Sequence, residues 1–170
     1  MRLREAVSVL AGVAMATLAM TAPLVRGAET VSADDAEVRH YALTMDKAQR
    51  AATALQTINR MVAANPSLNA AMDASGGSTG KKPITQQAHD IDSQYPQIAA
   101  IIHANGLATR EFIVLTGAII NDVGWVGMKK SGMVQAYPPG MITPENAALI
   151  EGNWDAFQAI AAKMTPPNTR

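Results

Sequence analysis

The sequence predicts an all-α protein, a bundle of four to five helices around one central buried helix at about residues 110–130. Apolar residues recur at helical spacing in several long segments. Hydrophobic residues make up 48% of the chain and charged residues 16%, which is typical of a globular protein. Only 4% are aromatic, so alanine and the aliphatic residues must fill the core, and alanine is the best helix former.

Residues 1–27 have the pattern of a signal peptide. Two arginines precede an uncharged, mostly apolar run at residues 6–20. Val25 and Gly27 occupy the two positions where signal peptidase needs small residues, so we expect cleavage before Ala28 and a periplasmic or secreted protein. The alternative is a retained membrane anchor, because the apolar run approaches spanning length.

The chain contains no cysteine, which excludes a lipoprotein anchor, disulfides, thiolate metal sites and covalent haem attachment through cysteine. The 14 basic residues are balanced by 14 acidic ones, and no basic run exceeds a pair. We therefore expect no nucleic-acid partner.

After the signal, residues 28–43 are charged and show little pattern, so we expect a mobile lead-in. A single helical domain at residues 44–165 and a tail at 166–170 follow. Thr44 can cap a helix that begins at Met45 and continues for about twenty residues. One face of that helix is apolar: Ala48, Ala51, Ala52, Leu55, Ile58 and Val62.

Prolines divide the middle of the chain. Pro66 restarts a short helix, and residues 75–83 read as a flexible glycine-rich loop that lacks the glycine spacing of a phosphate-binding loop. A helix resumes after Thr85 and restarts at Pro96, and Gly106 supplies a C-terminal stop.

The next helix, at residues 110–130, is apolar on nearly every side, which is typical of a buried helix. Thr109 is its expected N-cap. Asn121 and Asp122 interrupt the apolar sequence, so we expect a core helix and no stable membrane span after signal cleavage.

A long connection at residues 133–142 leads to the last helix, which Thr143 caps and Pro144 starts. Trp154 and Phe157 share its apolar stripe, so we expect both to be buried.

Glu111, Asp122 and Lys129 form a narrow polar seam on the central helix. A carboxylate in a buried helix must be paired or have a shifted pKa, so this seam is the candidate for acid–base catalysis. The structural alternative is that the seam faces water, or that Asp122 bonds a neighbouring backbone group.

Around the long connection, Met128, Met133 and Met141 gather near Tyr137, which indicates a contact surface for a protein partner or a small apolar ligand. Methionines can also hold Cu(I), but copper loops space them more tightly. His103 is the candidate metal or haem ligand. The three histidines of the chain do not share the spacing that places two ligands on one helix face, so we expect no cofactor.

Three segments resemble uncharacterised exported helical proteins of Gram-negative bacteria. They are residues 41–44, residues 106–112 and the stretch from Pro138-Pro139-Gly140 to Thr143-Pro144-Glu145-Asn146. All three are helix-boundary motifs. The resemblance implies a helical fold and export, and it carries no activity.

These observations favour a non-catalytic periplasmic binding or interaction module. The alternatives are a small enzyme that uses the polar seam, and a haem or metal carrier that uses His103 or the loop methionines.

Overall fold

The computed structural model describes residues 32–68, 70–71 and 82–164. The expected signal peptide, the tail and most of the glycine-rich loop lie outside the described residues. Within them every regular element is an α-helix, which confirms the predicted all-α class. The helices are α2 (Ala33–His40), α3 (Met45–Ala63), α5 (Ile84–Gln94), α6 (Pro96–Ala104), α7 (Thr109–Lys130), α8 (Pro144–Gly152) and α9 (Trp154–Met164).

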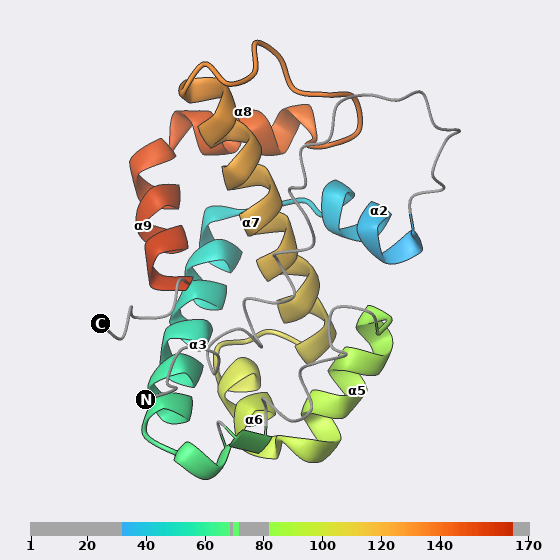
Figure 1. The fold of residues 1–170 in the computed structure, drawn as a ribbon, viewed down its shortest axis with the longest axis vertical. Helices are drawn as coiled ribbons and strands as arrows, with labels where there is room; N and C mark the ends of the chain where they lie inside the picture. The colour runs from blue at the N-terminus through green and yellow to red at the C-terminus, as the bar shows by residue number, and fades with distance from the viewer. Residues whose placement is uncertain (1–31, 69, 72–81, 165–170) are drawn as a thin grey trace.

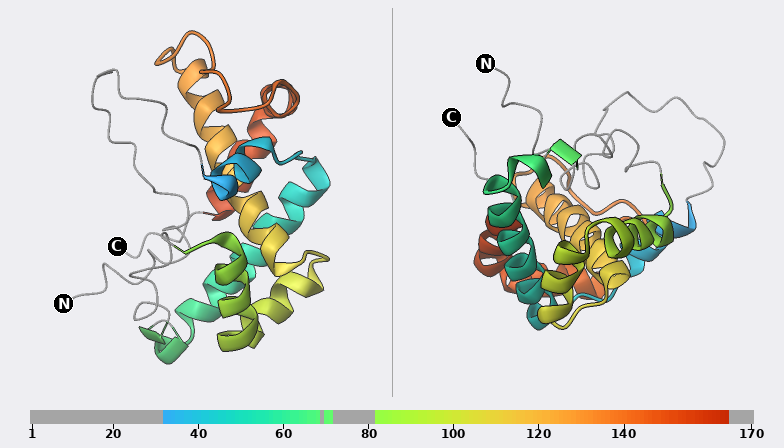
Figure 2. Two further views of the ribbon diagram at one scale, coloured as in Figure 1. Left: turned by 90° about the vertical axis from the view of Figure 1, so that its right-hand side faces the viewer. Right: turned by 90° about the horizontal axis from the view of Figure 1, so that it is seen from below.

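The predicted central helix is α7, which packs against each of the other six helices named above. In Figure 1, α7 runs through the middle of the molecule, with α3 and α9 on one side and α2 and α5 on the other. Its first turn lies near α6, and α8 lies at its opposite end (Figure 1). The left view of Figure 2 shows the same arrangement from the side. By length and composition α7 would also suit a membrane span. Half of its most apolar 18-residue stretch is buried inside the protein, however, which favours a core helix.

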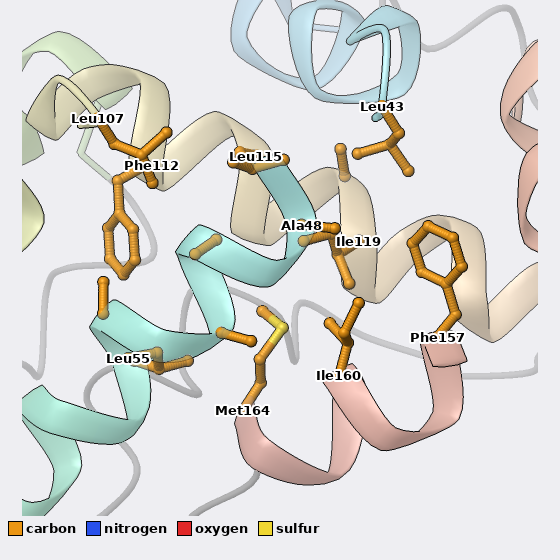
Figure 3. Packing of buried hydrophobic residues seen from close by; sticks show 14 of the residues in the cluster. Leu43, Ala48, Leu55, Leu107, Phe112, Leu115, Ile119, Phe157, Ile160 and Met164 are labelled. Carbon is orange, nitrogen blue, oxygen red and sulfur yellow. The ribbon is translucent and has the colours of Figure 1, made fainter. Parts of the chain in front are cut away.

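The core is built from short side chains, as the composition predicts. Figure 3 shows side chains from α3, α7 and α9 pointing toward one another, among them Leu55, Phe112 and Ile160. Four alanines of α3 are fully or almost fully buried, so α9 and α7 approach that helix closely. A smaller cluster of Ile84, Ala88, Ile113 and Val114 attaches α5 to α7.

The expectation of a mobile lead-in at residues 28–43 is wrong for residues 33–40, which form α2. Ser32 caps this helix by accepting a hydrogen bond from the Asp35 N–H at 3.0 Å. Asp34 and Asp35 lie in its first turn, and Arg39 and His40 lie in its last turn, as the helix dipole favours. The sequence shows little pattern because α2 needs only a narrow apolar face. Val38 packs against Gly117 of α7 so closely that a Cβ added to Gly117 would lie 3.3 Å from the Val38 side chain.

Two details of the later helices also differ from the prediction. The expected last helix breaks at Asn153 into α8 and α9, which raises the number of helices above the four or five predicted. Phe157 is fully buried as expected, whereas Trp154 is only partly buried because it begins α9 just after the break. Its ring lies under the Lys130 ammonium, 5.4 Å from the ring centroid, and packs close to Gly127.

Candidate functional site

The three residues of the predicted polar seam do not form one site. Eleven residues separate Glu111 from Asp122, and seven separate Asp122 from Lys129. At the helical rise these separations are roughly 16 Å and 10 Å along the axis. Each residue has its own partners from other elements, so the seam consists of three separate polar clusters.

Glu111 belongs to a cluster at the start of α7. It accepts a hydrogen bond from the Tyr41 hydroxyl at 2.8 Å and pairs with the Lys47 ammonium at 2.8 Å, and Lys47 also donates to the Tyr41 hydroxyl at 3.1 Å. The bond from Lys47, with the one from Tyr41, lowers the pKa of Glu111, and the bond to Glu111 raises the pKa of Lys47. Both groups are therefore charged at neutral pH, and they tie α7 to the start of α3.

Asp122 lies at the centre of the most enclosed cluster. Its side chain has no exposed surface, so the expectation that the seam faces water is wrong at this position. One carboxylate oxygen accepts from the Asn121 amide at 2.8 Å, and the other accepts from the Asn146 amide at 2.8 Å. The donors are thus side chains and not the neighbouring backbone groups that the structural alternative expected.

Asn146, at the start of α8, connects this carboxylate to the segment between α2 and α3. Its amide nitrogen also donates to the Tyr41 carbonyl at 2.8 Å, and its oxygen accepts from the Leu43 N–H at 3.0 Å. Asn146 is 2% exposed, and all of its polar hydrogens are used. The role of Asn146 was not predicted from the sequence, because asparagine in a first helical turn usually only caps the helix.

Within the described residues, no cationic side chain pairs with the Asp122 carboxylate. Burial raises its pKa to about 6, against the opposing effect of the two amide hydrogen bonds. A carboxyl with this pKa is suited to proton transfer, but a catalytic group must come within hydrogen-bond reach of a substrate. In this structure the Asp122 side chain has no exposed surface.

Lys129 belongs to the third cluster, at the far end of α7. Glu151 accepts from Lys129 at 2.8 Å and from the Tyr137 hydroxyl at 2.5 Å, and the lysine ammonium lies 4.6 Å from the Tyr137 ring centroid. The bond from Lys129 lowers the pKa of Glu151, and burial, together with the bond to Glu151, raises that of Tyr137. This cluster fastens the connection between α7 and α8 to α8.

The residues predicted to form a contact surface lie on that connection and on the end of α7. Met128, Tyr137 and Met141 are half-buried, whereas Met133 is 67% exposed. Among the described residues, Met133 is the one large hydrophobic side chain that is exposed. The Met141 carbonyl accepts from the Asn121 amide at 2.7 Å, which links this connection to the Asp122 cluster.

His103, the candidate metal ligand, is exposed at the end of α6, and its Nε2 lies 3.2 Å from the Thr109 hydroxyl. That hydroxyl has one hydrogen, which it donates to Asp92 at 2.5 Å. His103 Nε2 must then carry a hydrogen, which leaves only Nδ1 for a metal. In the part of the chain described, no group of three or more His, Asp or Glu residues is arranged to hold a metal ion.

Thr109 therefore does not cap α7 as predicted. Its hydroxyl joins α5, α6 and α7, and Ala108 takes the N-cap position without a side-chain bond.

Comparison of the chain with protein families, with curated proteins and with solved structures found no match in any of the three.

Proposed function

We propose that this chain is an exported, non-catalytic interaction module that binds a protein partner through the loop between α7 and α8, residues 131–143. The observation that carries the proposal is the enclosure of Asp122. The most suitable acid–base group of the chain is fully buried and bonded to Asn121 and Asn146. Glu111 and Lys129 are engaged in ion pairs as well, so the seam acts to hold the helices together.

The loop is the part of the described surface best suited to a partner. None of its thirteen residues carries a charge, and most of them are exposed. Met133 projects from it with two thirds of its surface exposed. An exposed apolar side chain in an uncharged surround is typical of an interaction site.

Between the two kinds of partner expected, this geometry favours a protein over a small ligand. A small apolar ligand needs a concave site that encloses most of its surface. The Met133 side chain is exposed, and its flexible thioether is suited to fill an apolar recess that the partner supplies. The loop is also tethered at Tyr137 and Met141, which reduces the entropy lost when it binds.

Export is supported by the residues before Ala28, which satisfy the signal-peptidase rule, and by the resemblance to exported helical proteins. N-terminal sequencing of the protein from a periplasmic fraction should give Ala28 as the first residue. Recovery of the intact chain in the membrane fraction would contradict this part of the proposal.

The binding proposal is tested with tagged protein purified from its native source under mild conditions. Native mass spectrometry should detect a stoichiometric protein complex with the wild type. Met133→Asp should reduce the complex at least tenfold. Gln135→Asp is the matched control, because it adds the same charge to an exposed position of the same loop and should retain the complex.

Equal binding by both variants, or loss in both, would overturn the role of Met133. An absorption band or a bound small molecule in the purified protein would instead support the carrier alternative, and the proposal of a protein-binding module would then fail.

A further inference from the structure

The Asn121 amide lies between the Asp122 carboxylate and the α7–α8 loop, and a single nitrogen serves both. It donates one hydrogen to Asp122 Oδ1 at 2.8 Å and the other to the Met141 carbonyl at 2.7 Å. Two acceptors require an NH₂ group at this position, so the orientation of the amide is set by its partners. The arrangement is complete only while Asp122 is ionised and accepts on both oxygens.

A protonated Asp122 would need an acceptor for its new hydrogen. Asn146 presents its amide nitrogen to Asp122, and two backbone groups hold it in that orientation: its oxygen accepts from the Leu43 N–H, and its nitrogen also donates to the Tyr41 carbonyl. Asn121 is able to supply an acceptor if its amide turns by about 180°, because its oxygen would then face the carboxyl O–H. The same turn would place that oxygen against the Met141 carbonyl, which would leave two acceptors facing each other.

We propose that Asp122 and Asn121 form a proton-operated latch, in which protonation of Asp122 turns the Asn121 amide and releases the α7–α8 loop at Met141. The latch deepens the function proposed above, on which its biological role rests, by giving the partner-binding loop a regulated state. The chemistry depends only on the donors and acceptors around Asp122. The one covalent change is the O–H bond that the Asp122 carboxylate forms with a proton from solvent, and every other change is in hydrogen bonds.

The surroundings of Asp122 make it the group that responds. The side chains whose polar atoms bond it are both neutral amides, Asn121 and Asn146. Charged or titratable side chains on the neighbouring elements do not bond it. Arg39 on α2 is only partly buried, and exposed side chains are His40 on α2, Glu145 on α8 and Asp155 on α9. Bonded elsewhere are Tyr41 before α3, Lys47 on α3 and Glu151 on α8. Burial then dominates and raises the pKa of Asp122 to about 6, so the latch would operate between about pH 5 and pH 7.

A second tether of the same loop does not respond over this range. Tyr137 and Lys129 both bond Glu151, whose pKa is lowered chiefly by Lys129, so Glu151 stays ionised. Ile142 is also buried and keeps the end of the loop in place. Acidification therefore frees the part of the loop near Met141, and the loop remains attached at Tyr137.

The latch is tested by NMR of the protein labelled with ¹³C at the methionine methyl groups. In the wild type, the Met141 methyl signal should shift and narrow as the pH falls from 7.5 to 5.0, with a midpoint near 6. The Met61 methyl, on α3, serves as an internal reference. Asp122→Asn mimics the neutral carboxyl, so its Met141 signal should stay at the low-pH position throughout. Glu151→Gln should retain the transition, because it alters only the second tether.

Asn121→Ala provides a second variant if Asp122→Asn fails to fold. It has no amide to turn, so its Met141 signal should be in the released position at every pH. The latch is refuted if Met141 does not respond while the Asp122 carboxyl titrates, or if either variant keeps the high-pH signal. These spectra need no partner, so a failed latch is distinguishable from a failed binding proposal, which Met133→Asp tests separately.

Discussion

Replacement of Asn146 by alanine removes the side chain that joins three elements of the interior. The change leaves the Leu43 N–H and the Tyr41 carbonyl without their partner, and it deprives the buried Asp122 carboxylate of one of its two donors. A buried polar group left without a hydrogen bond costs about 1–3 kcal/mol, and more when it is charged. Entering water can restore part of this loss, so we expect Asn146→Ala to reduce the free energy of unfolding by about 3–5 kcal/mol.

The measurement is urea denaturation followed by circular dichroism at pH 7.5. Asn153→Ala is the matched control, because it removes the same amide from an exposed asparagine. Among the described residues, the Asn153 side chain bonds only the Leu149 carbonyl, at 2.8 Å. Its effect should be within about 0.5 kcal/mol. A loss below about 1 kcal/mol for Asn146→Ala would refute the reasoning, because the Asp122 cluster would then contribute little to holding α8.

Three further predictions concern stability. The pKa of Asp122 is about 6 in the folded protein and 3.8 in the reference state, so the folded state binds more protons between these values. The contribution of Asp122 to the free energy of unfolding is therefore complete below about pH 4 and is lost as the pH rises through 6, by up to about 3 kcal/mol. Urea midpoints measured across this range should fall with rising pH in the wild type and should lose this dependence in Asp122→Asn. Phe157→Ala should cost about 3–5 kcal/mol in the same assay at pH 7.5. Trp154→Ala should cost about 1–2 kcal/mol, because that side chain is only partly buried, and an equal loss for the two would contradict the break between α8 and α9. Gly106→Ala should lower the thermal midpoint and cost about 1–2 kcal/mol, since Gly106 has φ of 72°; an unchanged midpoint would mean that the turn relaxes.

The long helices were predictable because their apolar residues repeat over many turns. For α3 the sequence predicted both the Thr44 cap and the first helical residue, and for α7 it predicted the extent to within one residue. Local periodicity decides these features. In contrast, α2 has no buried residue, and its position depends on contacts with α7, which begins about seventy residues later in the chain.

The candidate site was predictable only in part. The sequence predicted that a carboxylate in this buried helix must be paired or have a shifted pKa, but the expectation that the seam faces water was wrong at Asp122. The sequence did not identify the partner Asn146, which lies 24 residues away in sequence. That pairing depends on how α8 crosses α7, and local sequence patterns do not predict how two helices cross. The contact between Thr109, Asp92 and His103 was missed for the same reason, since it requires three helices to meet.

The packing of every described helix against α7 has a consequence for folding if the chain is exported, as proposed above. Proteins that cross a membrane through a narrow channel emerge from their N-terminus, so α2 and α3 would reach the far side well before Thr109. The main packing partner of α2 is α7, and α2 also needs the first residue of α5, whose N–H bonds Asp34 at 2.8 Å. The partners of α3 are α6, α7 and above all α9, which all come later in the chain. Roughly the first half of the folded domain must therefore wait in an open state, and most of the tertiary structure would form in one late step dominated by long-range contacts.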